Sequence, residues 1–189
     1  MKAVFMQDLG ALLRRPLVLI LITMMLVGLT TLVTAYWPIS DALTPDEISQ
    51  RGRTVWQGSI LIELAFIMLL APAVAAPALS SERQGGTFIL VMLSGIHPLS
   101  LAISKLGARF AVVSLVLLLP FPILITVATL GGTDFYTSVQ VMVTLLALGL
   151  LATSLGIFFS ALFDQAHRSV MASYCVLMLP FALPLILPA

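Results

Sequence analysis

Glu63 is the one ionisable residue that lies well inside a long apolar stretch of this 189-residue chain. A carboxylate that faces lipid is costly, so we expect Glu63 to face a bundle interior, a water-filled cavity or a cationic partner such as Arg51 or Arg53. In the interior, Glu63 could line a substrate route; near the membrane surface, it could instead reach interfacial water. A third interpretation, an intramembrane acid or base, is weakened because no second polar group lies in the nearby stretches.

The other reactive side chains do not form a recognisable catalytic or metal-binding pattern. His97 and His167 are seventy positions apart and have no acidic or cysteine companion at ligand spacing. Cys175 is the single cysteine, so no intramolecular disulfide can form. Neither lysine, Lys2 or Lys105, follows a glycine, so the chain has no GxxxxGK[ST] loop for nucleotide phosphates. We therefore expect no enzyme activity, metal or cofactor on this chain.

Composition places the chain in a membrane. Hydrophobic residues make up 60% of the sequence and charged residues 9%, and the mean hydropathy is +1.15. The net charge of +1 and the lack of a basic run argue against nucleic-acid binding. In hydrocarbon every backbone polar group must be paired within the protein, and continuous apolar runs favour helices over a barrel of alternating strands.

The apolar stretches are long enough to be membrane spans. A bilayer core about 30 Å thick needs roughly 20 residues of helix, and five stretches reach that length: 17–37, 59–79, 110–130, 138–162 and 169–188. Residues 1–15 carry apolar side chains at helical spacing, which favours a short interfacial helix over a frayed tail. We predict an all-α, polytopic membrane helix bundle that forms one domain over residues 1–189.

Basic residues sort between the two sides of this predicted bundle. If the N-terminus is cytoplasmic, the outer side holds only Arg51 and Arg53, and the cytoplasmic side holds seven basic residues: Lys2, Arg14, Arg15, Arg83, Lys105, Arg109 and Arg168. This asymmetry follows the positive-inside rule. We expect a multi-pass protein of the cell inner (cytoplasmic) membrane with a cytoplasmic N-terminus.

Prolines and small residues mark positions where the spans should bend or approach one another. Each interior proline removes a helix hydrogen bond and can kink the helix, and prolines occur at Pro72, Pro77, Pro120, Pro122, Pro180, Pro184 and Pro188. The fourth stretch carries small residues that favour close helix packing: Gly149, Ala152, Ser154 and Gly156.

Residues 80–109 form the loop between the second and third spans. Its apolar pieces, Phe88–Leu93 and Leu99–Arg109, are too short to cross a bilayer, and Gly95 and Pro98 interrupt the helical pattern between them. We expect two short cytoplasmic-face helices joined by a turn. A re-entrant loop is the structural alternative.

The sequence ALSSERQGGTFILVMLSGIHPLSLAISKL, which begins at Ala78, resembles the first cytoplasmic loop of ABC-2 type transporter permeases. In that family an acidic-basic pair and a Gly-Thr open an amphipathic helix, a Pro-containing turn follows, and a lysine precedes the third span. Here those features are similar to Glu82-Arg83, Gly86-Thr87, the Gly95–Pro98 turn and Lys105. The layout of the whole chain is similar, whereas the sequence resemblance covers about thirty residues.

The resemblance implies the membrane permease subunit of an ATP-binding cassette exporter. Its partners would be a cytoplasmic ABC ATPase subunit that binds ATP and Mg²⁺, a second permease half of the same or another sequence, and membrane lipid. The resemblance also implies an ATPase-coupling segment at Glu82, Arg83, Gly86, Thr87, Phe88, His97 and Lys105. Family members usually have six spans, so we expect this chain to be truncated before a sixth. The alternative is a membrane assembly or anchoring protein that moves no substrate.

Overall fold

The computed structural model describes residues 2–36, 44–86, 98–131 and 133–186, and within these ranges it is helical with no strand. The helices are α1 (Lys2–Leu13), α2 (Pro16–Tyr36), α3 (Pro45–Ala75), α4 (Pro77–Gln84), α6 (Pro98–Leu118), α7 (Phe121–Leu130), α8 (Phe135–Leu162) and α9 (Ala166–Ile186). The expected all-α fold class is therefore confirmed for the described residues.

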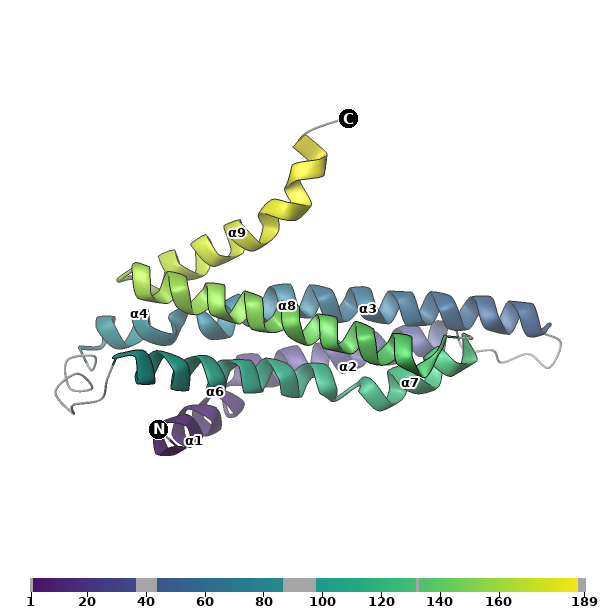
Figure 1. The fold of residues 1–189 in the computed structure, drawn as a ribbon, viewed down its shortest axis with the longest axis horizontal. Helices are drawn as coiled ribbons and strands as arrows, with labels where there is room; N and C mark the ends of the chain where they lie inside the picture. The colour runs from purple at the N-terminus through teal and green to yellow at the C-terminus, as the bar shows by residue number, and fades with distance from the viewer. Residues whose placement is uncertain (1, 37–43, 87–97, 132, 187–189) are drawn as a thin grey trace.

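Figure 1 shows α2, α3, α6 and α8 running side by side along the long axis of the molecule. The short helices α1 and α4 lie at one end of this bundle, which we call the α4 end, and α7 lies at the opposite α7 end. Helix α9 packs against α8 and α4 at its start and then leaves the bundle at an angle. The chain thus passes repeatedly between the two ends.

Among the described residues, four helical stretches are long and apolar enough to cross a membrane: α2 (Pro16–Tyr36), α3 with α4 (Pro45–Gln84), most of α6 with α7 (Leu99–Thr129) and α8 (Phe135–Leu162). They agree with the first four predicted spans, and they identify the chain as a multi-pass membrane protein by length and composition. The fifth predicted span, 169–188, falls on α9 and extends into residues 187–189, which lie outside the described part of the chain. Its crossing of the membrane stays a prediction, as does the interfacial placement of α1.

Two helices are longer than predicted. Helix α3 begins at Pro45 rather than near Ser59, because Thr44 and Glu47 form a capping box: the Thr44 hydroxyl accepts the Glu47 N–H, and the Thr44 N–H donates to the Glu47 carboxylate at 2.8 Å. Helix α6 runs unbroken from Pro98 to Leu118. The prediction of a separate short helix at Leu99–Arg109 is wrong, because no helix breaker separates it from the third span.

The long helix that ends at Gln84 is interrupted at Pro77 and not at Pro72, which lies inside α3. Proline 77 starts α4, and the N–H groups that follow it have no partner within their own helix. The hydroxyl of Ser160 on α8 accepts hydrogen bonds from the N–H groups of Leu79 at 2.7 Å and Ser80 at 3.1 Å. Ser169 on α9 donates to the Ala76 carbonyl at 2.8 Å. Side chains from two other helices therefore supply hydrogen-bond partners to the backbone groups at the interruption.

Helix α8 packs closely because its inner face is made of small residues. An added Cβ at Gly156 would lie 2.7 Å from the Cβ of Ala75, and one at Gly149 would lie 3.1 Å from Val113. Ala152 is also buried, whereas Ser154 is exposed, so the predicted close packing applies to three of the four small residues. The contact fixes α8 against the end of α3, where the helix is interrupted.

The outward faces of the bundle are apolar. Large exposed side chains recur along helices of the bundle, as a surface in contact with lipid or another apolar partner requires, and on α2 they are Leu17, Leu19, Ile20, Met24 and Val27. The interior is apolar as well, with a core in which Met25, Ile67, Leu70, Val112 and Leu117 are buried.

We predict that replacing glycine by alanine changes the stability of the protein differently at two helical positions. Gly156→Ala should destabilise the protein by about 1–3 kcal/mol, because its Cβ would overlap Ala75. Gly28→Ala should leave stability unchanged or raise it by up to about 1 kcal/mol, because nothing lies within 4 Å of its Cβ and alanine favours a helix. Thermal unfolding in one detergent measures both variants, and equal stability of the two would contradict the close α3–α8 contact.

Ser160→Ala should lower stability by about 1–3 kcal/mol, because it removes the acceptor of two buried N–H groups without adding volume. Ser154→Ala on the same helix is the control. Its exposed hydroxyl donates only to the carbonyl of Leu151, so we expect almost no change. The same unfolding assay compares the pair, and indistinguishable midpoints would show that Ser160 does not complete the interruption at Pro77.

Candidate functional site

Glu82 and Lys105, two of the predicted coupling residues, form an ion pair between α4 and α6. Glu82 lies near the end of α4, before residues 87–97, and Lys105 lies two turns into α6, after them. The Lys105 side chain is 2% exposed, so its ammonium group is held inside the protein rather than presented at a surface. The pair therefore fixes α4 and α6, the two helices on either side of residues 87–97 in the sequence, to one another.

Asp8 and Arg109 extend this pair into a four-residue cluster, which we call the ionic cluster: Asp8, Glu82, Lys105 and Arg109. Arg109 Nη1 donates to Asp8 Oδ2 at 2.7 Å, and Lys105 Nζ lies 3.6 Å from the same oxygen. The Arg109 side chain is 7% exposed. Two carboxylates and two cations make the cluster formally neutral, and removal of one member would leave a buried charge unbalanced.

Local structure explains how three helices meet at this cluster. Lys105 and Arg109 are four residues apart on α6, so they share one face of the helix. Asp8 comes from α1, where Leu12 is buried in the core and Leu9 and Leu13 pack against it. Apolar contacts therefore hold α1 against the bundle, and they bring its carboxylate to the two cations.

Arg83 connects α4 to the segment between α8 and α9. Its Nη1 donates to the Ala161 carbonyl at 3.0 Å and to Asp164 Oδ1 at 3.2 Å. Gly86, which follows α4, is exposed and has φ of 68°, a conformation that glycine adopts without steric cost. The described end of the predicted coupling segment is thus anchored on α6, α1 and α8.

The remaining predicted coupling residues, Thr87, Phe88 and His97, lie outside the described residues, as does the predicted Gly95–Pro98 turn apart from Pro98 itself. Sequence reasoning did not assign Asp8 and Arg109 to the site. One signal was present in the sequence, because Arg109 follows Lys105 at helical spacing. No sequence pattern indicated that α1 would fold back onto α6 and bring Asp8 to that face.

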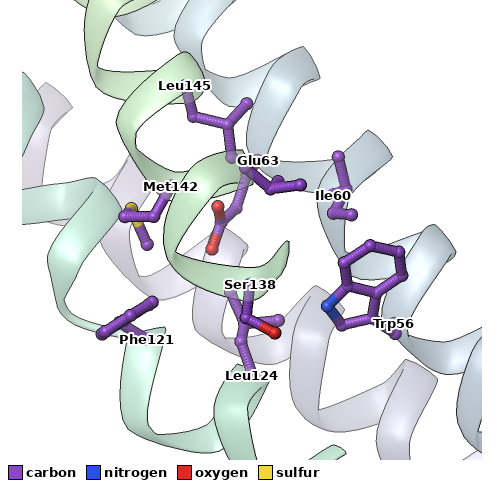
Figure 2. A pocket seen from close by; sticks show the side chains of 9 residues that line it. Trp56, Ile60, Glu63, Phe121, Leu124, Ser138, Met142 and Leu145 are labelled. Atoms are coloured by element: carbon purple, nitrogen blue, oxygen red, sulfur yellow. The ribbon is translucent and has the colours of Figure 1, made fainter. Parts of the chain in front are cut away.

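Glu63 lies in the interior of the bundle, in the half nearer the α7 end, and is 0% exposed. It lines a cavity of about 10 Å³ between α3, α7 and α8, about the room that one water needs. Figure 2 shows its carboxyl group extending from α3 between Met142 and Ser138 of α8. The other lining residues are Trp56, Ile60, Phe121, Leu124, Val141 and Leu145.

Both carboxyl oxygens of Glu63 are buried, and neither has a hydrogen-bond partner among the described residues. The two arginines considered as partners are engaged elsewhere or exposed. Arg53 Nε donates to the Gly131 carbonyl at the end of α7, at 3.2 Å, and Arg51 lines an open groove with Tyr36 and Glu47. Glu63 thus contrasts with the ionic cluster, in which each member has a charged partner.

Within the described parts of the chain, no group of three or more His, Cys, Asp or Glu residues could hold a metal ion. Cys175 is a free, exposed thiol on α9. The chemistry that the described residues bring together is therefore limited to the ionic cluster at the α4 end and the buried carboxyl group at Glu63.

We predict that Lys105→Met destabilises the protein by up to about 3 kcal/mol, because it leaves Glu82 and Asp8 with one cation between them while both keep partial access to water. Adding Glu82→Gln should recover part of this loss, since it restores the charge balance. Arg168→Met, at an exposed basic residue of α9, is the control and should change little. Thermal unfolding of the wild type, the two single variants Lys105→Met and Glu82→Gln, the double variant and the control tests the cluster, and strictly additive losses in the double variant would contradict the Glu82–Lys105 pairing.

Comparisons with known proteins add no family assignment. No protein-family model matches the chain, and searches of curated proteins and of solved structures find no match either. Function must therefore be argued from the fold, the ionic cluster and the buried carboxyl group. What these observations establish directly is a helical, multi-pass membrane protein.

Proposed function

We propose that this chain is the membrane permease subunit of an ATP-binding cassette exporter, in which ATP is hydrolysed on a separate cytoplasmic subunit. The observation that carries the proposal is the ion pair of Glu82 and Lys105, together with its extension to Asp8 and Arg109. The pair joins the helices that enter and leave residues 87–97, the segment that resembles the ATPase-contacting loop of ABC-2 permeases.

A contact on that segment would reach the bundle by two connected paths. Helix α3 continues into α4, and the two helices together span 40 residues, Pro45–Gln84. At 1.5 Å per residue this is about 60 Å. Helix α6 starts at Pro98 and runs to Leu118. Because Glu82 and Lys105 are paired, a displacement at the α4 end would move both helices, and Asp8 would carry it to α1.

The orientation in the proposal places the α4 end in the cytoplasm. Arg83 lies on α4, and Lys105 and Arg109 pair with residues of α4 and α1 at that end. Arg14 and Arg15 connect α1 to the start of α2, and Arg168 lies in the first turn of α9, whereas Arg51 and Arg53 lie on the first turns of α3 at the other end. The distribution supports a cytoplasmic N-terminus by the positive-inside rule. The ATPase subunit, with its bound ATP and Mg²⁺, would then dock at the α4 end.

The apolar outer surface supports the need for a second permease half. Helix α2 has most of its side chains directed outward, and α9 departs from the bundle beyond its first turns (Figure 1). The cavity beside Glu63, with about 10 Å³, has room for one water and not for a larger substrate. The proposed transporter would form its path between two halves.

Affinity purification in a mild detergent from the native membrane tests the proposal. We expect a stoichiometric chain with a Walker motif to co-purify, together with ATPase activity. Replacement of residues 87–93 by a Gly/Ser linker of equal length should remove that partner while the variant still inserts in the membrane. The control replaces residues 38–43, in the connection at the α7 end, in the same way and should keep the partner.

If the wild-type chain purifies alone and shows no ATPase activity above background, the transporter proposal fails and the anchoring alternative takes its place. Capture of the ATPase by the 87–93 linker variant would have a different meaning. It would keep the permease assignment and remove that segment as the docking site.

A further inference from the structure

We propose that Glu63 is a proton-binding site of the bundle: its carboxylate takes a proton from a hydronium ion, which leaves a neutral acid and one water in the cavity between α3, α7 and α8. The inference rests on the surroundings of Glu63 alone, so it holds whether or not an ATPase partner exists. It goes beyond transport to assign a ligand to a residue that the proposed coupling mechanism does not use.

No described residue forms a hydrogen bond with the carboxyl oxygens of Glu63 and so offsets the cost of burying their charge. Both are buried without a hydrogen-bond partner in the described part of the chain, and the cavity wall is otherwise apolar apart from Ser138 and the indole of Trp56. An ionised carboxylate in such a place costs far more than a neutral polar group. A positive charge must therefore accompany the negative one when the cavity is closed.

No basic residue of the described chain supplies that charge by a hydrogen bond to Glu63. The charged and titratable side chains on the elements packed against α3 are exposed or engaged elsewhere. Tyr174 donates to the Leu69 carbonyl, and Lys105, Arg109, Glu82 and Asp8 pair with one another in the ionic cluster. Arg83 bonds to Asp164, and Tyr36, Tyr136, His167, Arg168 and Cys175 are exposed; α7 carries no titratable side chain.

Calcium and magnesium do not suit this cavity, because of its size and the few ligands it offers. A cavity of about 10 Å³ has room for roughly one water. Calcium takes 6–8 oxygen ligands and magnesium about six in an octahedron, whereas the cavity wall offers one carboxyl group and the hydroxyl of Ser138. A proton is the cation that fits this site, and it needs only one acceptor atom.

Ser138 is a polar side chain of α8 that lines the same cavity as Glu63. Its hydroxyl is buried and makes only a long bond, 3.4 Å, to the carbonyl of Asp134, the residue before α8. A single water in the cavity can accept from the Glu63 acid and donate to this hydroxyl oxygen. Loss of the proton would leave a charge that draws in water, so ionisation of Glu63 should loosen the contact of α3 with α7 and α8.

Infrared spectroscopy of the purified full-length chain tests the site. At neutral pH the wild-type chain should show the C=O stretching band of a neutral carboxylic acid, and that band should shift in D₂O. Labelling with ¹³C-glutamate should also shift it, since the sequence holds three glutamates, Glu47, Glu63 and Glu82. Glu63→Gln should abolish the band. Glu47→Gln, an exposed position of the same helix, should keep it.

The labelled wild-type chain alone can overturn the proposal: without a neutral-acid band from glutamate at neutral pH, Glu63 binds no proton in this state. Persistence of the band in Glu63→Gln would assign it to another residue and have the same consequence. If Glu63→Gln does not fold, Glu63→Asp replaces it. The acid band of that variant should no longer shift with ¹³C-glutamate, and a band that still shifts would contradict the assignment.

Discussion

A polar group in hydrocarbon has no water to bond, so each one inside this bundle must find its partner within the protein. The interruption between α3 and α4 shows how this constraint shapes the fold. Proline 77 ends the regular hydrogen bonding of a long helix, and Ser160 and Ser169 supply the missing partners from α8 and α9. Three helices must therefore meet at the interruption, and the absence of a side chain at Gly156 lets α8 come close enough.

The same constraint separates the two groups of ionisable residues. At the α4 end, Asp8, Glu82, Lys105 and Arg109 balance one another and join α1, α4 and α6. Burying the two cations and half-burying the two carboxylates costs desolvation energy, so such a cluster contributes less to net stability than to fixing how these helices are paired. Glu63 has no such balance, because neither oxygen of its buried carboxyl group has a hydrogen-bond partner among the described residues.

Sequence reasoning succeeded where one physical cause dominates. Long apolar runs predicted the helical class and four membrane-length helices, because length and hydropathy decide both. It erred at Leu99–Arg109, which was predicted as a separate short helix because the piece is too short to cross a bilayer. In the structure the piece continues into the third span as α6, where tertiary pairing buries the side chains of Lys105 and Arg109. The partners of these residues come from positions 23 and 101 residues away in sequence, and no local pattern encodes such distances. The same holds for Ser160, whose acceptor role depends on an interruption 80 residues earlier.

The interruption at Pro77 also decides how the two sites can influence one another. Glu63 and Glu82 lie on the α3–α4 helix pair, 19 positions apart, or about 28 Å along a helix. A displacement of α4 reaches Glu63 only if the junction at Ala76 transmits it rather than bending. Ser160 holds the start of α4, Ser169 holds the Ala76 carbonyl, and Tyr174 bonds to Leu69 about two turns before the junction. All three bonds come from α8 and α9, so the stiffness of the junction depends on helices that carry neither Glu63 nor a member of the ionic cluster. Whether a displacement at the ionic cluster reaches Glu63 therefore depends on α8 and α9, whose hydrogen bonds hold the α3–α4 junction.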